Sequence, residues 1–232
     1  MKHLIATKDK IYSIIAHDLK NPFNAIIGFT SLIINSWDDF DSERKKQYIG
    51  KVNESATNAY ELLENLLEWS RAQTGKIIVH PENVGIKAHV NEIINQVTEQ
   101  ANLKGITILN LVEPSVFINV DVNMIGSVIR NILSNAIKFS NENGIVKVTS
   151  EYQANGDITI AIEDNGVGIS GDVLASLFNF ETHLSTYGTN NEKGTGLGLL
   201  ICKEFIDKNN GRIAVESKVD KGTKFIMTFP KS

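Results

Sequence analysis

The sequence predicts two parts: an N-terminal antiparallel helical hairpin, which becomes a four-helix bundle in a dimer, and a C-terminal α+β two-layer sandwich. Apolar residues recur at heptad spacing in the first part, and helical segments alternate with strands in the second. Between them, Gly75, Pro81 and Gly85 mark a junction. We therefore expect the hairpin over residues 1–73, a linker over 74–85 and the second domain over 86–232.

The hairpin rests on two apolar stripes with alternating spacings of three and four residues. A break over residues 36–42 separates them, where Asp41 or Ser42 is a candidate N-cap. Two helices cannot bury such wide stripes alone, so we expect a homodimer through the hairpin. The first stripe comprises Ile15, Leu19, Pro22, Ile26, Phe29 and Ile33, and the second Ile49, Val52, Ala56, Ala59, Leu63, Leu66 and Ser70.

The second domain is expected to place helices on one face of a largely antiparallel sheet. Ile158, Ile160 and Ile162 alternate with more polar residues, which is typical of a strand with one buried face. Asp121 is the expected N-cap of a helix that ends at Phe139. The other expected helices cover 86–101 and the segment after residue 198, and the expected strands cover 77–79, 106–111, 116–120, 145–152, 157–163, 212–217 and 224–229.

Composition disfavours several classes of protein. Lys and Arg number 23 against 27 Asp and Glu, and this net charge of −4 offers no basic stripe for nucleic acid. The one cysteine, Cys202, excludes an internal disulfide and fits a reducing compartment. No apolar run approaches membrane-spanning length, so we expect no membrane contact within this chain. The N-terminus has no signal peptide and reads as the middle of a helix, so we expect a fragment of a longer protein.

A histidine on the first helix is the first candidate functional residue. The heptad count places His17 at the position furthest from the partner helices, and Asp18 follows it. Pro22 removes a helical hydrogen bond at the carbonyl of Asp18 and bends the helix there. A surface histidine near an accidental kink remains the alternative interpretation.

Two glycine-rich segments are candidates for nucleotide binding. Asp164 ends a buried strand and is followed by a turn with glycines at 166 and 168, where a carboxylate can accept a hydrogen bond from a ligand amine. Residues 194–199, GTGLGL, open a helix whose N–H groups can bind phosphate. The segment does not fit the G-x-G-x-x-G or P-loop patterns, so a nucleotide would be held by another scheme. Ordinary turns of this composition are the alternative.

A polar helix face is the fourth candidate. Asn131, Asn135 and Lys138 recur at helical spacing. Two amide oxygens one turn apart suit Mg²⁺, and a lysine can meet a phosphate. A solvated polar face would have the same pattern.

In their order along the chain, these segments resemble the motifs of sensor histidine kinases. Residues 17–22, HDLKNP, resemble the H box and residues 131–140 the N box. Residues 164–169 and 194–199 resemble the two glycine boxes, 177–180 the F box and 222–225 the closing G-T-x-F. The resemblance covers nearly the whole chain. It implies a dimerisation and histidine-phosphotransfer hairpin followed by a Bergerat-type ATP-binding domain.

The resemblance also implies residue roles. His17 would accept the γ-phosphoryl group of ATP, Asp18 would assist it, and Asn21 would take part in dephosphorylating the partner protein. Asn135, with Asn131, would hold Mg²⁺, and residues 181–193 would form the ATP lid. The implied nucleotide-binding residues are Asn131, Asn135, Lys138, Asp164, Gly166, Gly168, Gly194, Thr195, Gly196, Leu197, Gly198 and Thr223.

The activity implied is ATP-dependent autophosphorylation of His17 and transfer to an aspartate on a response-regulator receiver domain, in the cytoplasmic part of a sensor that could be membrane-anchored. One alternative is a dimeric nucleotide-binding scaffold that has lost the kinase step and acts through its conformation or as a phosphatase. Another is an ATP hydrolase, which Asn131 disfavours because related hydrolases carry Glu at that position to activate water.

Overall fold

The computed structural model describes residues 2–73, 78–179, 186–190, 192 and 196–231, without the side chains of 2–18, 61, 65 and 68–73. The chain divides into two compact units, Met1–Arg71 and Ala72–Ser232. Each unit is described by itself below.

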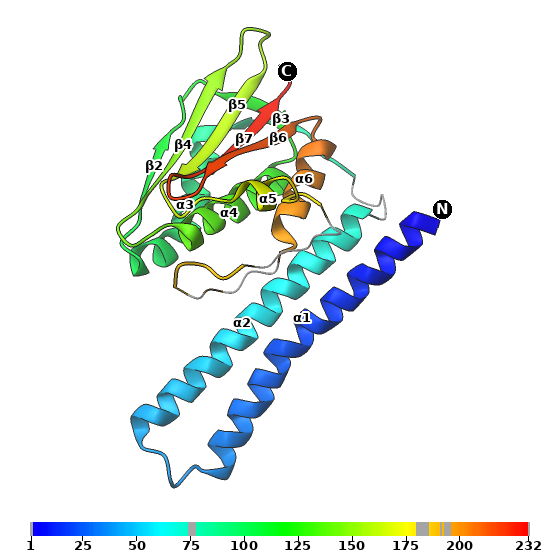
Figure 1. The fold of residues 1–232 in the computed structure, drawn as a ribbon. Helices are drawn as coiled ribbons and strands as arrows, with labels where there is room; N and C mark the ends of the chain where they lie inside the picture. The colour runs from blue at the N-terminus through cyan, green and yellow to red at the C-terminus, as the bar shows by residue number, and fades with distance from the viewer. Residues whose placement is uncertain (1, 74–77, 180–185, 191, 193–195, 232) are drawn as a thin grey trace. The chain divides into compact units, whose positions relative to one another are not determined.

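The first unit is the expected helical hairpin, made of α1 (Lys2–Asn35) and α2 (Ser42–Gln73), which run antiparallel (Figure 1). Asp41 is the N-cap of α2, because its Oδ1 accepts a hydrogen bond of 2.7 Å from the backbone N–H of Arg44. Near the turn, the ring of Tyr48 stacks on Phe29 of α1 with centroids 5.7 Å apart. This aromatic contact joins the two helices next to the connection.

The apolar stripes of the hairpin are incompletely covered within one copy of the chain. Ile49 and Leu63 of the predicted α2 stripe are 52% and 42% exposed. On α1, the described side chains of the predicted stripe are half-buried, whereas Phe23 and Ile27, which lie outside that stripe, are 53% and 63% exposed. No helix among the described residues is both long enough and apolar enough to cross a membrane.

The second unit contains a five-stranded sheet in the order β2-β4-β5-β7-β6. Neighbouring strands are antiparallel except β2 and β4, which are parallel. Ile158, Ile160 and Ile162 are buried as predicted, but Ala161 between them is also buried, so the predicted alternation is only partly observed. The strands are β2 (Thr107–Leu111), β4 (Ile145–Tyr152), β5 (Ile158–Asp164), β6 (Arg212–Lys218) and β7 (Gly222–Phe229).

The first strand of the second unit lies in a two-stranded antiparallel ribbon, at a different position from the one predicted. β1 (Glu82–Gly85) pairs with β3 (Phe117–Val120), with Glu82 opposite Val120 and Gly85 opposite Phe117. The strand expected over 77–79 is not observed at Ile78 and Val79, and residue 77 lies outside the described residues. β-Branched residues favour strands, but a strand also needs a paired neighbour, and β3 supplies one further along the chain. Residues 82–85, which we expected in the linker, therefore belong to the second unit.

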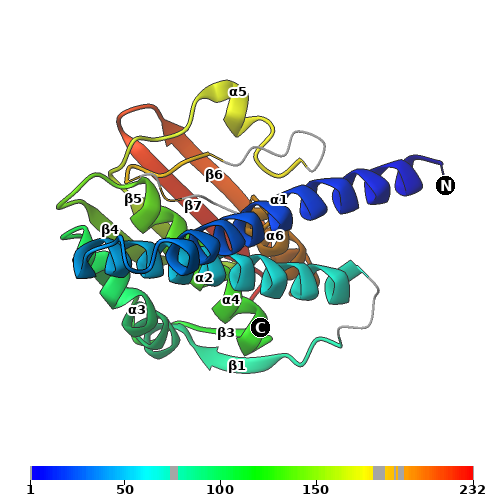
Figure 2. The same cartoon turned by 90° about the horizontal axis from the view of Figure 1, so that it is seen from below.

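Helices cover one face of the five-stranded sheet (Figures 1 and 2). α4 (Val122–Phe139) packs between α3 (Ile86–Leu103) and α6 (Gly198–Lys208) and against β4 and β5. Asp121 caps α4 as predicted, with Oδ1 accepting from the N–H groups of Asn123 and Met124 at 3.1 Å. The apolar face of α4 is buried, which turns its polar face toward the cavity described below. A short helix, α5 (Gly171–Leu174), follows the first glycine segment.

Candidate active site

A cavity of about 320 Å³ lies in the second unit between the polar face of α4, the first glycine segment and the start of α6. Its wall combines charged, amide and apolar side chains with several glycines. The lining residues used below are Asn131, Asn135, Lys138, Asp164, Gly168, Ile169, Val173, Leu177, Thr186, Tyr187, Gly196, Gly198, Thr223 and Phe225.

Asp164 supplies the buried carboxylate of the cavity. It is the last residue of β5 and only 6% exposed. Burial raises the pKa of its carboxyl, although hydrogen bonds from the N–H groups of Gly166 and Thr223 oppose the increase. Both N–H groups donate to Oδ1, at 2.9 and 3.2 Å. The carboxylate is thus held through one oxygen, and Oδ2 can accept from a ligand that carries an amino group.

The first glycine segment packs closely on neighbouring backbone. Gly168 has a φ of +68°, and a Cβ there would overlap the carbonyl oxygen of Lys218. A Cβ at Gly166 would overlap the carbonyl oxygen of Phe139 at the end of α4. Gly168 lines the cavity, whereas Gly166 is buried and does not. The lack of a Cβ at Gly166 permits the loop to pack on the end of α4.

Asn131 and Asn135 present two amides to the cavity from successive turns of α4. Nδ2 of Asn135 lies 3.5 Å from Oδ1 of Asn131, and both side chains are half-buried. A Cβ at Gly198 would displace the Asn131 amide, so glycine lets this amide lie against the start of α6. The described residues include no cluster of three or more His, Cys, Asp or Glu suited to a metal. Amide oxygens nevertheless fit Mg²⁺, which accepts few protein ligands and completes its shell with water and phosphate oxygens.

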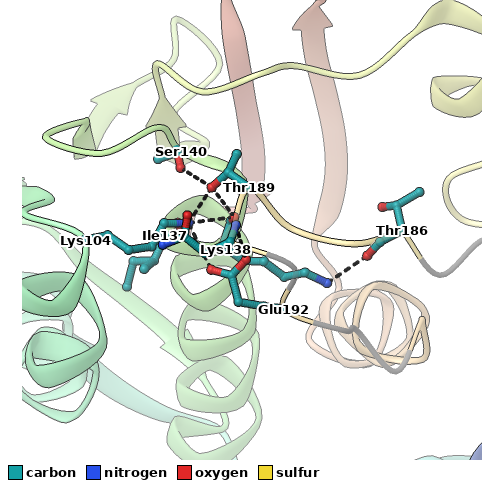
Figure 3. A network of polar contacts seen from close by, with 8 residues as sticks. Lys104, Ile137, Lys138, Ser140, Thr186, Thr189 and Glu192 are labelled. Atoms are coloured by element: carbon teal, nitrogen blue, oxygen red, sulfur yellow. Dashed lines mark hydrogen bonds and ion pairs between the residues drawn. The ribbon is translucent and has the colours of Figure 1, made fainter.

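Lys138 brings a buried ammonium to the same wall. It is 8% exposed, and its Nζ donates to the carbonyl oxygen of Thr186 at 3.0 Å (Figure 3). Burial lowers its pKa, the negative charge of Glu192 opposes the decrease, and the positive charge of Lys104 adds to it. The ammonium is therefore removed from bulk water and placed where a phosphate could reach it.

The second glycine segment is described only in part. Gly194 and Thr195 lie outside the described residues. Gly196 and Gly198 line the cavity, and α6 begins at Gly198 with no side chain capping its first N–H groups. Leu197 is 2% exposed, and it is not among the residues that line the cavity. Its apolar side chain belongs to the core, and only its glycine neighbours meet the cavity.

Thr223 and several apolar side chains complete the wall. The backbone N–H of Thr223 donates to Oδ1 of Asp164, so Thr223 lies beside the buried carboxylate. Ile169, Val173, Leu177 and Phe225 add the apolar surface that a flat ring needs. The sequence reasoning assigned no nucleotide contact to these four, because apolar residues near a motif give the same signal as core residues.

The candidate phosphorylation site lies in the first unit. His17 and Asp18 belong to α1, but their side chains are outside the described part of the chain. Asn21 is exposed one turn further on. Pro22 lies inside the continuous helix and, having no N–H, cannot donate to the carbonyl of Asp18.

Comparison with known proteins identifies both units. Residues 7–75 match the His Kinase A (phospho-acceptor) domain, and residues 120–232 match the histidine kinase-, DNA gyrase B- and HSP90-like ATPase. The cell-division control histidine kinase PdhS of Brucella suis is 29% identical over 233 residues, which cover 96% of this chain and 22% of that protein. The chain thus spans about a fifth of the length of this curated relative.

Solved structures share the fold. Histidine kinase ThkA, in complex with the response regulator protein TrrA, gives a TM-score of 0.78 at 22% identity and covers 100% of this chain and 64% of that one. The Acinetobacter baumannii histidine kinase AdeS gives 0.72 at 21% identity and covers 93% of this chain and 98% of that one. With both domains matched in this order, the chain belongs to the sensor histidine kinases and comprises their catalytic core. Its phospho-acceptor hairpin precedes an ATPase domain of the α/β sandwich type.

Proposed function

We propose that this chain transfers the γ-phosphoryl group of ATP to His17 and then to an aspartate of a response-regulator receiver domain. The observation that carries the proposal is the cavity, where a buried carboxylate and the amide and lysine face of α4 line one space. A carboxylate suits the amino group of adenine, and amides and an ammonium suit phosphates. Both ends of a nucleotide thus have chemically suitable partners.

Each polar wall residue has a part in binding. Oδ2 of Asp164 would accept from the adenine amino group, because Oδ1 is occupied by backbone N–H groups. Asn135 and Asn131 would hold Mg²⁺, which neutralises phosphate charge when bound. Lys138 would meet a phosphate oxygen, and the N–H groups at the start of α6 would face the same anion.

The transfer step would use the imidazole as the nucleophile. A neutral ring nitrogen of His17 attacks the γ-phosphorus while the bond to the β–γ bridging oxygen breaks and ADP leaves. Asp18 would accept a hydrogen bond from the other ring N–H and stabilise the positive charge that develops on the ring. Asn21, exposed one helical turn away, would act later, in removing the phosphoryl group from the regulator.

Direct hydrolysis of ATP should be slow by comparison. The carboxamide of Asn131 lines the cavity but cannot take a proton from water at neutral pH, unlike a carboxylate. The phosphoryl group therefore needs an acceptor other than water. His17, in the matched phospho-acceptor domain, is the proposed acceptor.

Two protein partners and a location follow. A second copy would cover the exposed apolar residues of α1 and α2 and form a four-helix bundle. A receiver domain is supported by ThkA, whose structure contains the response regulator protein TrrA. We place the reaction in the cytoplasm, where ATP and a receiver domain would meet it.

A labelled-ATP time course with the whole chain tests the proposal. Wild type should acquire label that is lost in acid and retained in base, as expected for phosphate on nitrogen. His17→Gln should bind nucleotide but acquire none. Acid-stable label, or undiminished label in His17→Gln, would move the acceptor to another residue.

A further inference from the structure

Lys104 lies in none of the motifs, yet its buried ammonium reaches the end of α4. It directly follows α3 and is 5% exposed. Nζ donates to the carbonyl oxygens of Ile137 and Lys138, both at 3.0 Å. These carbonyls belong to the last turn of α4, where helical N–H partners are missing and a positive charge is favoured. Lys104 therefore caps the C-terminal end of the helix that carries Asn131 and Asn135.

The same ammonium also binds the lid segment. Nζ donates to Oγ1 of Thr189 at 2.6 Å and to Oε1 of Glu192 at 3.0 Å (Figure 3). An ammonium has three N–H groups, so these four oxygens share them. The backbone N–H of Thr189 donates to the carbonyl of Lys138 at 3.1 Å, and its hydroxyl to that of Ser140 at 2.7 Å. The described residues around Thr189 are thus tied to α4.

Glu192 is held as an ionised partner in this network. Burial acts to raise the pKa of its carboxyl, but hydrogen bonds from backbone N–H groups and from Lys104 outweigh burial and lower it. Its second oxygen accepts from the N–H of Asn190 at 2.8 Å. The carboxylate thus links Lys104 to the lid backbone.

The network ends at residues that line the nucleotide cavity. Thr186 and Tyr187, in the same described segment as Thr189, form part of the wall. Nζ of Lys138 donates to the carbonyl of Thr186, so the direction of the Lys138 ammonium depends on where this segment lies. Lys104 contacts both the end of α4 and the lid. Both must stay in position if the Lys138 ammonium is to contact a phosphate.

We propose that Lys104 is a positioning residue for binding of the nucleotide phosphates. It anchors Thr189 and Glu192 of the lid to the end of α4 and thereby orients the Lys138 ammonium toward a phosphate. The inference rests on the proposed function, in which this cavity binds ATP. It assigns to Lys104 no contact with adenine or with the transferred phosphoryl group. Removing the anchor should therefore weaken binding of a nucleotide with phosphates and spare binding of adenosine.

Calorimetry on the whole chain, in a His17→Gln background that cannot be phosphorylated there, separates these effects. Mg·ATP and adenosine are titrated into Lys104→Met, Lys104→Arg and the charge-balanced pair Lys104→Met/Glu192→Gln. Because several hydrogen bonds are lost together, Mg·ATP affinity should fall about tenfold in Lys104→Met and in the pair. Adenosine affinity should stay within about twofold, and Lys104→Arg should recover part of the loss. Lys147→Met, which alters an exposed lysine of β4, should change neither affinity.

The charge-balanced pair distinguishes loss of the anchoring contacts from loss of charge alone. Wild-type Mg·ATP affinity in that pair would show that charge alone mattered and would overturn the anchoring role. Should Lys104→Met fail to fold, Thr189→Val decides, because it removes one anchoring hydroxyl and keeps both charges. It should lower Mg·ATP affinity about threefold and leave adenosine unchanged. No loss, or equal loss of both ligands, overturns the proposal, whereas failure of the background protein to bind Mg·ATP overturns the proposed function instead.

Discussion

The substitution Asp164→Asn should separate nucleotide binding from folding. The asparagine carbonyl can still accept the N–H groups of Gly166 and Thr223 that now reach Oδ1 at 2.9 and 3.2 Å. The other carboxylate oxygen becomes an NH₂ donor, which cannot accept from an adenine amino group. A hydrogen bond to a charged group contributes about 1.5–3 kcal/mol. At about 1.4 kcal/mol per decade, Mg·ATP affinity should fall about 10- to 150-fold.

Folding stability should respond in the opposite sense. Burial raises the folded-state pKa of Asp164 above the unfolded value. The stability contribution of the protonated form is therefore fully present below the unfolded-state pKa and is lost as pH rises through the folded-state pKa. The ionised carboxylate is a cost at neutral pH, and asparagine removes it. The melting temperature of Asp164→Asn at pH 7 should equal or exceed that of wild type.

The assay pairs calorimetry with thermal unfolding in the His17→Gln background. Glu151→Gln is the matched control, since it neutralises an exposed carboxylate of β4 that is not part of the cavity wall and should alter neither affinity nor melting temperature appreciably. Unchanged Mg·ATP affinity in Asp164→Asn would refute the assignment of the adenine acceptor. Weak binding together with a lower melting temperature would instead mean that the carboxylate supports the fold.

The remaining predictions concern the other parts of the site. Asn135→Ala should weaken nucleotide binding in Mg²⁺ and change it little in EDTA, as measured by calorimetry, and equal loss in both buffers would argue against a metal ligand. Asp18→Asn should slow labelling of His17 roughly 10²- to 10⁴-fold at unchanged ATP affinity, and full-speed labelling would strip Asp18 of its role. Residues 76–232 should sediment as a monomer that binds ATP, and a dimer would contradict an interface in the hairpin.

Local patterns in the sequence account for much of the fold. The heptad stripes predicted α1 and α2, because helical periodicity is set by neighbours three and four residues apart. Asp121 was predictable as the cap of α4, since it bonds N–H groups two and three residues away. The alternation through Ile158 and Ile160 predicted β5 and its buried face in the same way. The order of the motifs then indicated the family, because each motif consists of residues close together in the sequence.

Only the tertiary structure could decide where these local units meet. The first strand is Glu82–Gly85, which pairs with β3, and not the more apolar residues 77–79 that the sequence predicted. Leu197 and Gly166 lie within nucleotide-binding motifs but face the core and the end of α4, because each motif must also pack on its own domain. Thr223 reaches Asp164 across 59 residues of sequence, and Lys104 reaches Glu192 across 88. Such contacts depend on strand pairing and helix packing between distant segments, and periodicity within one segment carries no information about them.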